Sequence, residues 1–145
     1  MVGPRGNSMN ETIPQTERLP RQQRRLRVLV ADKNAHFRET VRRVLVRIGR
    51  CAVCGEAATI AEVIHQVTTS SVDLLLLDID MVTQDRLAEL NRLARRLPEV
   101  KVAVLLSDDT PEYRAAVRRH GDHFCVAKDS LEEQLPPVLK SVLAP

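Results

Sequence analysis

Five short apolar runs alternate with segments of helical spacing, and this alternation most constrains the fold of the 145-residue chain. Apolar residues at i, i+3, i+4 and i+7 lie on one face of a helix. Apolar parallel strands need cover on both faces, and right-handed crossovers restrict how they connect. We therefore predict an α/β fold, a doubly wound five-stranded parallel sheet with helices on both faces. The expected strands are Leu26–Ala31, Cys51–Glu56, Val72–Leu77, Val102–Leu106 and Phe124–Ala127.

Local signals mark where the helices begin and end. Gly49 follows the first helical pattern and is expected to close it. Thr59–Glu62 and Ser130–Glu133 have the sequence of capping boxes, which begin helices. Pro136 and Pro137 lie within the last helical pattern, so we expect them to kink or restart that helix near its beginning.

Residues 1–25 differ in composition from the rest of the chain. They are polar, rich in Pro, Gln and Arg, and have no periodicity, so we expect a disordered basic tail followed by one domain over 26–145. The tail carries the whole formal charge of +3, and the remainder is neutral. A neutral domain with 2% aromatic residues offers neither an electrostatic footprint nor stacking platforms, so specific nucleic-acid binding is not expected.

Hydropathy and cysteine content bear on compartment and redox chemistry. The apolar runs are far shorter than the ~20 residues needed to cross a bilayer, so we expect a cytoplasmic protein without a membrane span. Cys51, Cys54 and Cys125 are expected to be free thiols. Cys51 and Cys54 have redox-motif spacing, but residues three apart in a strand point to opposite faces, so neither redox nor metal chemistry is expected there.

Charged residues follow the predicted strands. Asp32 follows the first strand, Asp78 and Asp80 the third, and Lys128 the fifth. The carboxyl ends of parallel strands meet at one edge of the sheet, beside the switch in strand order, so these side chains should lie close together. Clustered carboxylates attract a hard cation such as Mg2+. No glycine-rich loop follows the first strand, which excludes a dinucleotide or P-loop site.

The same residues carry a resemblance. From Leu26 to Leu143 the chain resembles the receiver domain of bacterial response regulators, the CheY-like module of two-component phosphorelay signalling. The resemblance implies that Asp78 is the phosphoacceptor, that Lys128 contacts the phosphoryl group, and that Asp32, Asp78 and Asp80 hold Mg2+. The matching segments are Val28–Asp32, Asp73–Met81, Pro111–Tyr113, Gly121 and Lys128–Asp129, with a step of fifty residues from Asp78 to Lys128.

Lys33 departs from the family pattern at the metal site, because it replaces the second metal-binding acid. Metal affinity should fall, and we expect Mg2+ to bind weakly or not at all. We expect the Lys33 ammonium to turn towards Asp32 and Asp78 and take the place of the ion, because opposite charges attract strongly at low dielectric. The alternative is that this long side chain extends into solvent.

Three further positions depart from the pattern at the switch. Leu106 stands where the family has a hydroxyl that contacts the phosphoryl group. Ser107 can supply a hydroxyl only if the loop shifts by one residue. Cys125 stands where the family has the switch aromatic, so the coupling between hydroxyl and aromatic should be broken.

The leading hypothesis is a stand-alone receiver protein that accepts a phosphoryl group at Asp78 and signals through protein contacts. The alternative is a pseudo-receiver that works without phosphorylation because Lys33 replaces an acid. A small phosphatase-like enzyme is a minor alternative, but no Ser or Cys stands beside a His, and we do not expect an enzyme. Expected partners are a histidine kinase or phosphotransfer protein and a downstream protein or second copy, bound on the face of the fourth helix, fifth strand and fifth helix.

Overall fold

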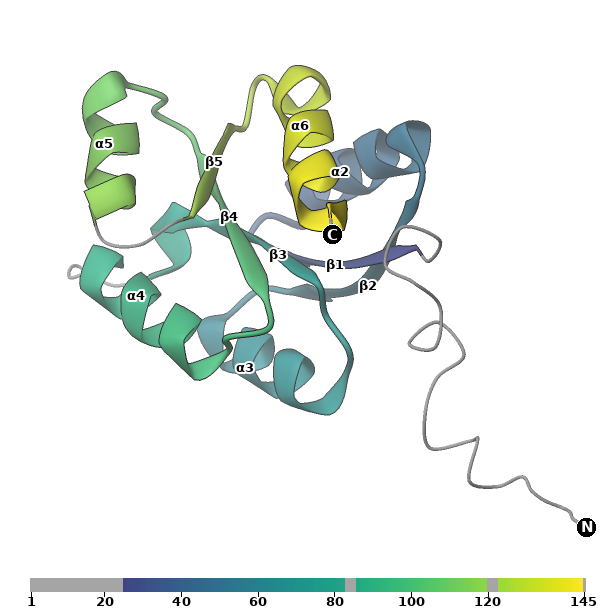
Figure 1. The fold of residues 1–145 in the computed structure, drawn as a ribbon, viewed down its shortest axis with the longest axis horizontal. Helices are drawn as coiled ribbons and strands as arrows, with labels where there is room; N and C mark the ends of the chain where they lie inside the picture. The colour runs from purple at the N-terminus through teal and green to yellow at the C-terminus, as the bar shows by residue number, and fades with distance from the viewer. Residues whose placement is uncertain (1–24, 83–85, 120–122, 145) are drawn as a thin grey trace, which may run out of the picture.

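The computed structural model describes residues 25–82, 86–119 and 123–144. Its centre is one sheet of five parallel strands in the order β2-β1-β3-β4-β5 (Figure 1), which confirms the predicted fold class. The strands are β1 (Leu26–Ala31), β2 (Cys51–Ala57), β3 (Leu74–Asp78), β4 (Lys101–Leu106) and β5 (Phe124–Ala127). The helices are α2 (Ala35–Ile48), α3 (Ile60–Thr69), α4 (Arg86–Arg96), α5 (Pro111–Arg119) and α6 (Leu131–Leu143), with a short 3-10 turn, η3 (Ile79–Met81).

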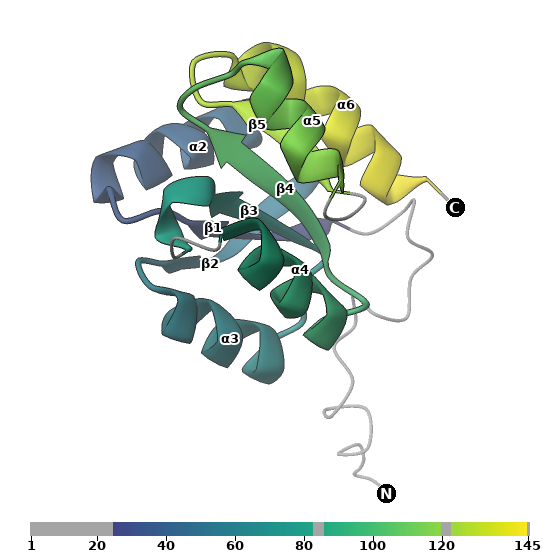
Figure 2. The same ribbon diagram turned by 90° about the vertical axis from the view of Figure 1, so that its left-hand side faces the viewer.

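Helices cover both faces of the sheet. α2 and α6 pack on one face, and α3, α4 and α5 pack on the other (Figure 2). β3 explains why two layers are needed: Leu74 and Leu76 enter one core, Leu75 and Leu77 enter the other, and none is exposed. An apolar strand of this kind is stable only with helices on both sides.

Two of the predicted helix signals act as expected. Gly49 ends α2 with a φ of 82°, a conformation that suits glycine, and its N–H donates to the Leu45 carbonyl oxygen. At the start of α3, the Thr59 hydroxyl accepts the Glu62 N–H at 3.1 Å, and a Glu62 carboxylate oxygen accepts the Ala58 N–H at 2.6 Å. The Thr59 half of the predicted capping box is therefore present, whereas the Glu62 carboxylate binds the N–H one residue before the N-cap Thr59.

The start of α6 differs from the prediction. The Ser130 side chain makes no capping hydrogen bond. Instead, the main-chain carbonyl oxygen of Ser130 accepts the N–H groups of Glu133 and Gln134. The prediction of a second capping box was therefore wrong. α6 also runs without a restart through Pro136 and Pro137. Burial of Leu131, Leu135, Val138, Leu139 and Val142 offsets the two missing N–H donors, because tertiary packing contributes most of the stability of a helix in a protein.

The cysteines are placed as expected. β1 and β2 change register between Val28 and Leu29, and the extra residue of the bulge is Cys54. Cys51 packs in the core under α2 and α6, whereas Cys54 packs in the opposite core. All three cysteines are free, and burial raises the pKa of each thiol, which disfavours thiolate chemistry.

Two predictions lie largely or wholly outside the described residues. The basic tail assigned to 1–25 overlaps them only at Arg25, and Gly121, which is part of the family resemblance, is not among them. Within the described part of the chain, no helix is long and apolar enough to cross a membrane.

Candidate functional site

The centre of the site is a pair of carboxylates at the ends of β1 and β3. These neighbouring strands pair in register up to Ala31 and Leu77, so Asp32 and Asp78, each one residue further on, lie side by side. Both are buried, with 2% and 5% of their surface exposed. The strand order reverses at β1 and β3, which is where a sheet of this kind forms its site.

Lys128 supplies the positive charge. It follows β5, and its Nζ lies 2.6 Å from Asp32 Oδ2 and 3.4 Å from Asp78 Oδ1, so one ammonium bridges both carboxylates. The same Nζ also lies 4.6 Å from the ring centroid of Phe37 and makes a cation–π contact with that ring. The predicted meeting of Asp32, Asp78 and Lys128 at one edge of the sheet is present in the structure.

Main-chain N–H groups bind the carboxylates further. The Asn34 N–H donates to Asp32 Oδ1 at 2.8 Å, and the Asp80 N–H donates to Asp78 Oδ1 at 3.1 Å. A buried carboxylate needs such donors, because an unpaired one is costly. The side chain of Asp80, in η3, is exposed and is not packed among the buried carboxylates.

The two ion-pair partners differ in how the site shifts their pKa. Burial raises the pKa of Asp78, and the negative charge of Asp32 acts in the same direction, against the lowering effects of the Asp80 N–H and of Lys128. Burial lowers the pKa of Lys128, but the hydrogen bond and charge of Asp32 and the charge of Asp78 outweigh it and raise that pKa overall. Lys128 thus stays protonated, while Asp78 takes up a proton at a higher pH than an ordinary aspartate does.

Lys33 does not take the inward position that we expected. The residue is exposed, and the amine beside Asp32 and Asp78 is that of Lys128. The physical reason is that Lys128 already satisfies the charge of the buried pair, so a second ammonium would lose its hydration without gaining an unpaired carboxylate. The outward alternative is the one that the structure contains.

The arrangement of the charged groups can be tested against a divalent ion. Within the described residues, no group of three or more His, Cys, Asp or Glu side chains is placed to hold a metal. The carboxylates of Asp32 and Asp78 converge, and Lys128 contacts both. Mg2+ prefers several oxygen ligands in octahedral geometry. The groups that would hold such an ion are the carboxylates of Asp32 and Asp78 and, as the resemblance implies, the main-chain oxygen of Asp80.

The positions expected to carry the switch are packed differently. Leu106 is 1% exposed and belongs to the core under α3, α4 and α5, while Ser107 is exposed. Both line a hollow of about 50 Å³ together with Ile79, Asp80, Asp108 and Tyr113. Cys125 is half-buried on the edge strand β5. Leu106 thus acts as a core residue and offers no hydroxyl to the site.

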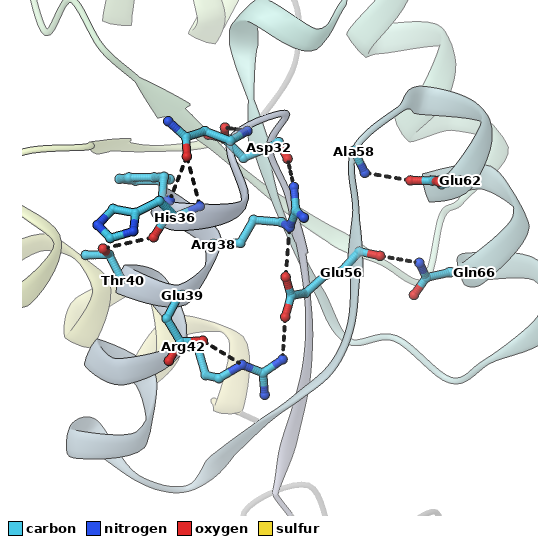
Figure 3. A network of polar contacts seen from close by, with 12 residues as sticks. Asp32, His36, Arg38, Glu39, Thr40, Arg42, Glu56, Ala58, Glu62 and Gln66 are labelled. Carbon is cyan, nitrogen blue, oxygen red and sulfur yellow. Dashed lines mark hydrogen bonds and ion pairs between the residues drawn. The ribbon is translucent and has the colours of Figure 1, made fainter.

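A second polar network extends the site towards α2 and β2, and sequence reasoning missed it (Figure 3). Arg38 donates to the main-chain oxygen of Asp32 and, at 2.7 Å, to Glu56; Arg42 donates to the other Glu56 carboxylate oxygen at 2.5 Å. The Gln66 amide donates to the Glu56 carbonyl oxygen at 2.6 Å. The hydrogen bonds from Arg42 and Arg38 lower the pKa of Glu56. The sequence did contain a signal for this network: Arg38 and Arg42 are four residues apart on one helix face, and Glu56 lies near the end of the neighbouring strand.

Comparison with known proteins decides the family. A sequence profile of the response regulator receiver domain matches residues 28–140, which is most of the chain. The chain belongs to the response-regulator receiver family. It is a receiver domain of two-component signal transduction, as the resemblance implied.

Curated relatives of this receiver domain are longer proteins. It is 27% identical over 117 residues to the uncharacterized transcriptional regulatory protein YxjL of Bacillus subtilis, and 27% identical over 118 residues to the oxygen regulatory protein NreC of Staphylococcus aureus. Each alignment covers 81% of this chain and 54% of the relative. The chain therefore spans about half the length of the curated relatives it matches.

Solved structures give the same fold. The isolated receiver domain of RcsB from Salmonella enterica superposes with a TM-score of 0.72 at 21% identity, covering 81% of this chain and 88% of that one. The signal receiver domain of NarL from Mycobacterium tuberculosis superposes with a TM-score of 0.68 at 26% identity, covering 83% and 97%. The RcsB likeness, at this identity, concerns the fold alone.

Proposed function

We propose that this receiver domain is a non-enzymatic protein-binding module whose site is held by the Lys128 ion pairs and does not depend on phosphorylation. The observation that carries the proposal is the single ammonium bridging two buried carboxylates, 2.6 Å from Asp32 and 3.4 Å from Asp78. A transferred phosphoryl group brings negative charge, which in this family Mg2+ and the lysine neutralise together. Here Lys33 replaces one metal-binding acid, so we also propose that Mg2+ binds weakly.

Two further features support this proposal. Leu106 lies in the core and has no hydroxyl with which to hold a phosphoryl group. Cys125 replaces the aromatic side chain that changes position when the phosphoryl group binds. The site therefore lacks both the hydroxyl at position 106 and the aromatic at position 125 that couple phosphorylation to output in this family. The proposed output is contact with a protein on the face formed by α5, β5 and α6, where a downstream protein or a second copy binds.

A second candidate function is phosphorylation at Asp78. It is favoured by one observation: Asp78 ends β3 with Lys128 3.4 Å away, so the acceptor carboxylate and one cation for the phosphoryl oxygens are both in place. In that case a histidine kinase or phosphotransfer protein is the partner, and phosphorylation shifts a two-state equilibrium.

One experiment separates the two candidates. The purified chain is incubated with Mg2+ and acetyl phosphate, and its intact mass is measured, with Asp78→Ala as the control for acceptor identity. We expect no added phosphoryl mass in the wild type, and a mass gain in Lys33→Asp, which restores the missing acid. A gain in the wild type that is lost in Asp78→Ala would overturn phosphorylation-independence and establish the second candidate.

A further inference from the structure

Arg114, near the start of α5, links four segments of the chain. Its Nε and Nη2 donate to the two carboxylate oxygens of Asp109 in the loop after β4, with Nη2 3.1 Å from Oδ2. Its Nη1 donates to the carbonyl oxygen of Cys125 in β5 at 3.3 Å, and Nη2 donates to Gln134 Oε1 in α6 at 2.8 Å. The same Gln134 oxygen accepts the Ala127 N–H at the end of β5, at 2.8 Å.

The geometry uses what is special about arginine. A guanidinium presents five N–H donors in a rigid plane, so it can bind a carboxylate with two parallel hydrogen bonds and still reach other acceptors. The hydrogen bond from Arg114 holds the pKa of Asp109 below its usual range, so the carboxylate stays charged. Arg114 is 26% exposed, which places the group at the surface of the fold with its donors turned inward to protein acceptors.

The location of these bonds gives them a functional meaning. α5, β5 and α6 form the face on which the proposed function places protein contact, and β5 is a four-residue edge strand. A receiver that switches must let this region rearrange. Here the loop after β4 and the strand that carries Cys125 are hydrogen-bonded to the same side chain.

We propose that Arg114 is a clamp that fixes the β4–α5 loop, α5, β5 and α6 in one arrangement, so that this face is a binding surface already formed without phosphorylation. The functional reading rests on the proposed function, whereas the clamp itself can be tested with no phosphoryl donor present. Arg114 is a positioning residue in this proposal, because it acts through the elements that it holds together.

Two native cysteines allow the clamp to be tested: Cys125 on β5 reports opening of that strand, and Cys54 on β2 is the internal reference. Cys125, whose carbonyl Arg114 binds, and Cys54 are both half-buried, and burial raises the pKa of both thiols. They lie on β5 and β2, the opposite edges of the sheet. The measured quantity is the ratio of their iodoacetamide alkylation rates in the intact chain, followed by peptide mass analysis. We expect Arg114→Met to raise the ratio of Cys125 to Cys54 about tenfold, because β5 opens more often.

Arg118→Met is the matched control. The positive charges of Arg114 and Arg118 both lower the pKa of Cys125, against the larger effect of burial. Removing either arginine therefore slows alkylation through charge alone, and only loosening of β5 can accelerate it. We expect no rise in Arg118→Met and an intermediate rise in Arg114→Lys, which keeps the charge but loses the fork. A ratio in Arg114→Met that is unchanged or lowered would overturn the clamp.

Asp109→Asn keeps the test decisive if Arg114→Met does not fold. It weakens the clamp at its exposed end. Because the charge of Asp109 also raises the pKa of Cys125, the rates are compared per thiolate, from the pH dependence of each alkylation rate. We expect a ratio about threefold above that of the wild type, and an unchanged ratio would overturn the proposal. The outcome is independent of the mass experiment. Phosphoryl uptake by the wild type would overturn phosphorylation-independence and leave the clamp standing, whereas an unchanged alkylation ratio would do the reverse.

Discussion

Two halves of one site can be compared in this receiver domain. The acidic half, at the ends of β1 and β3, keeps Asp32 and Asp78 and pairs both with Lys128. The switch half, at the ends of β4 and β5, has Leu106 buried in the core and Cys125 half-buried on the edge. A buried charge constrains its partners strongly, because each lone group costs several kcal/mol. A hydroxyl or aromatic side chain that serves only to couple phosphorylation to output can be replaced without leaving a buried charge unpaired.

The two halves differ in what the fold requires of them. Asp32 and Asp78 sit where two apolar strands end, and the fold must neutralise them whatever the signal does. Lys128 supplies a positive charge to both carboxylates. In the structure Lys128 contacts both carboxylates of the acidic half, and Leu106 of the switch half packs in the core.

Lys128→Met should have the largest effect on stability. It leaves two buried carboxylates without their cation, and we expect unfolding free energy at pH 7 to fall by about 3 kcal/mol. Urea denaturation measures the change, with the exposed Lys101→Met as the matched control, where we expect less than about 0.5 kcal/mol. The loss should shrink in acid as Asp78, whose pKa is already raised, becomes protonated. A loss below about 1 kcal/mol would contradict the stabilising role of the acidic half.

Leu106→Thr tests the switch half and should have the second largest effect. It restores a hydroxyl but removes buried methyl groups and buries a polar atom, so we expect a loss of about 2 kcal/mol. Leu105→Thr, equally buried but facing the opposite core, is the control and should cost a similar amount. If Leu106→Thr proved neutral while Leu105→Thr did not, position 106 would belong to an adaptable switch instead of the core.

Glu56→Gln should have the smallest effect and sharpens the boundary of the acidic half. Glu56 is 31% exposed, so we expect a loss of about 1 kcal/mol at pH 7 from its two arginine contacts. The pKa of Glu56 is lowered in the folded state. Its contribution to stability is therefore fully present above the pKa of the unfolded state and is lost as the pH falls through the pKa of the folded state.

The measurement is the unfolding free energy against pH. The difference between wild type and Glu56→Gln should be constant near neutrality and should close in acid. A difference that widened as pH fell would contradict the assigned sign. Asp78 gives the opposite slope, because its folded pKa is raised: stability falls as pH rises from its unfolded value towards its folded one.

The sequence predicted correctly the features whose positions follow from the topology of the sheet. The strands, the helices between them and the convergence of Asp32, Asp78 and Lys128 were predicted, because parallel strand ends meet at one edge. It was wrong about Ser130 as a cap and about Lys33 turning inward. It did not detect the Arg114 clamp, whose partners are spread over three elements of the structure.

The sequence by itself determined the fold class and which charges meet at the sheet edge, because apolar periodicity and strand order are properties of the chain. Only the tertiary structure decided which lysine neutralises the two aspartates and what Arg114 binds. Long side chains reach several partners from one backbone position, and their choice depends on competition among neighbours that come together only when the chain is packed.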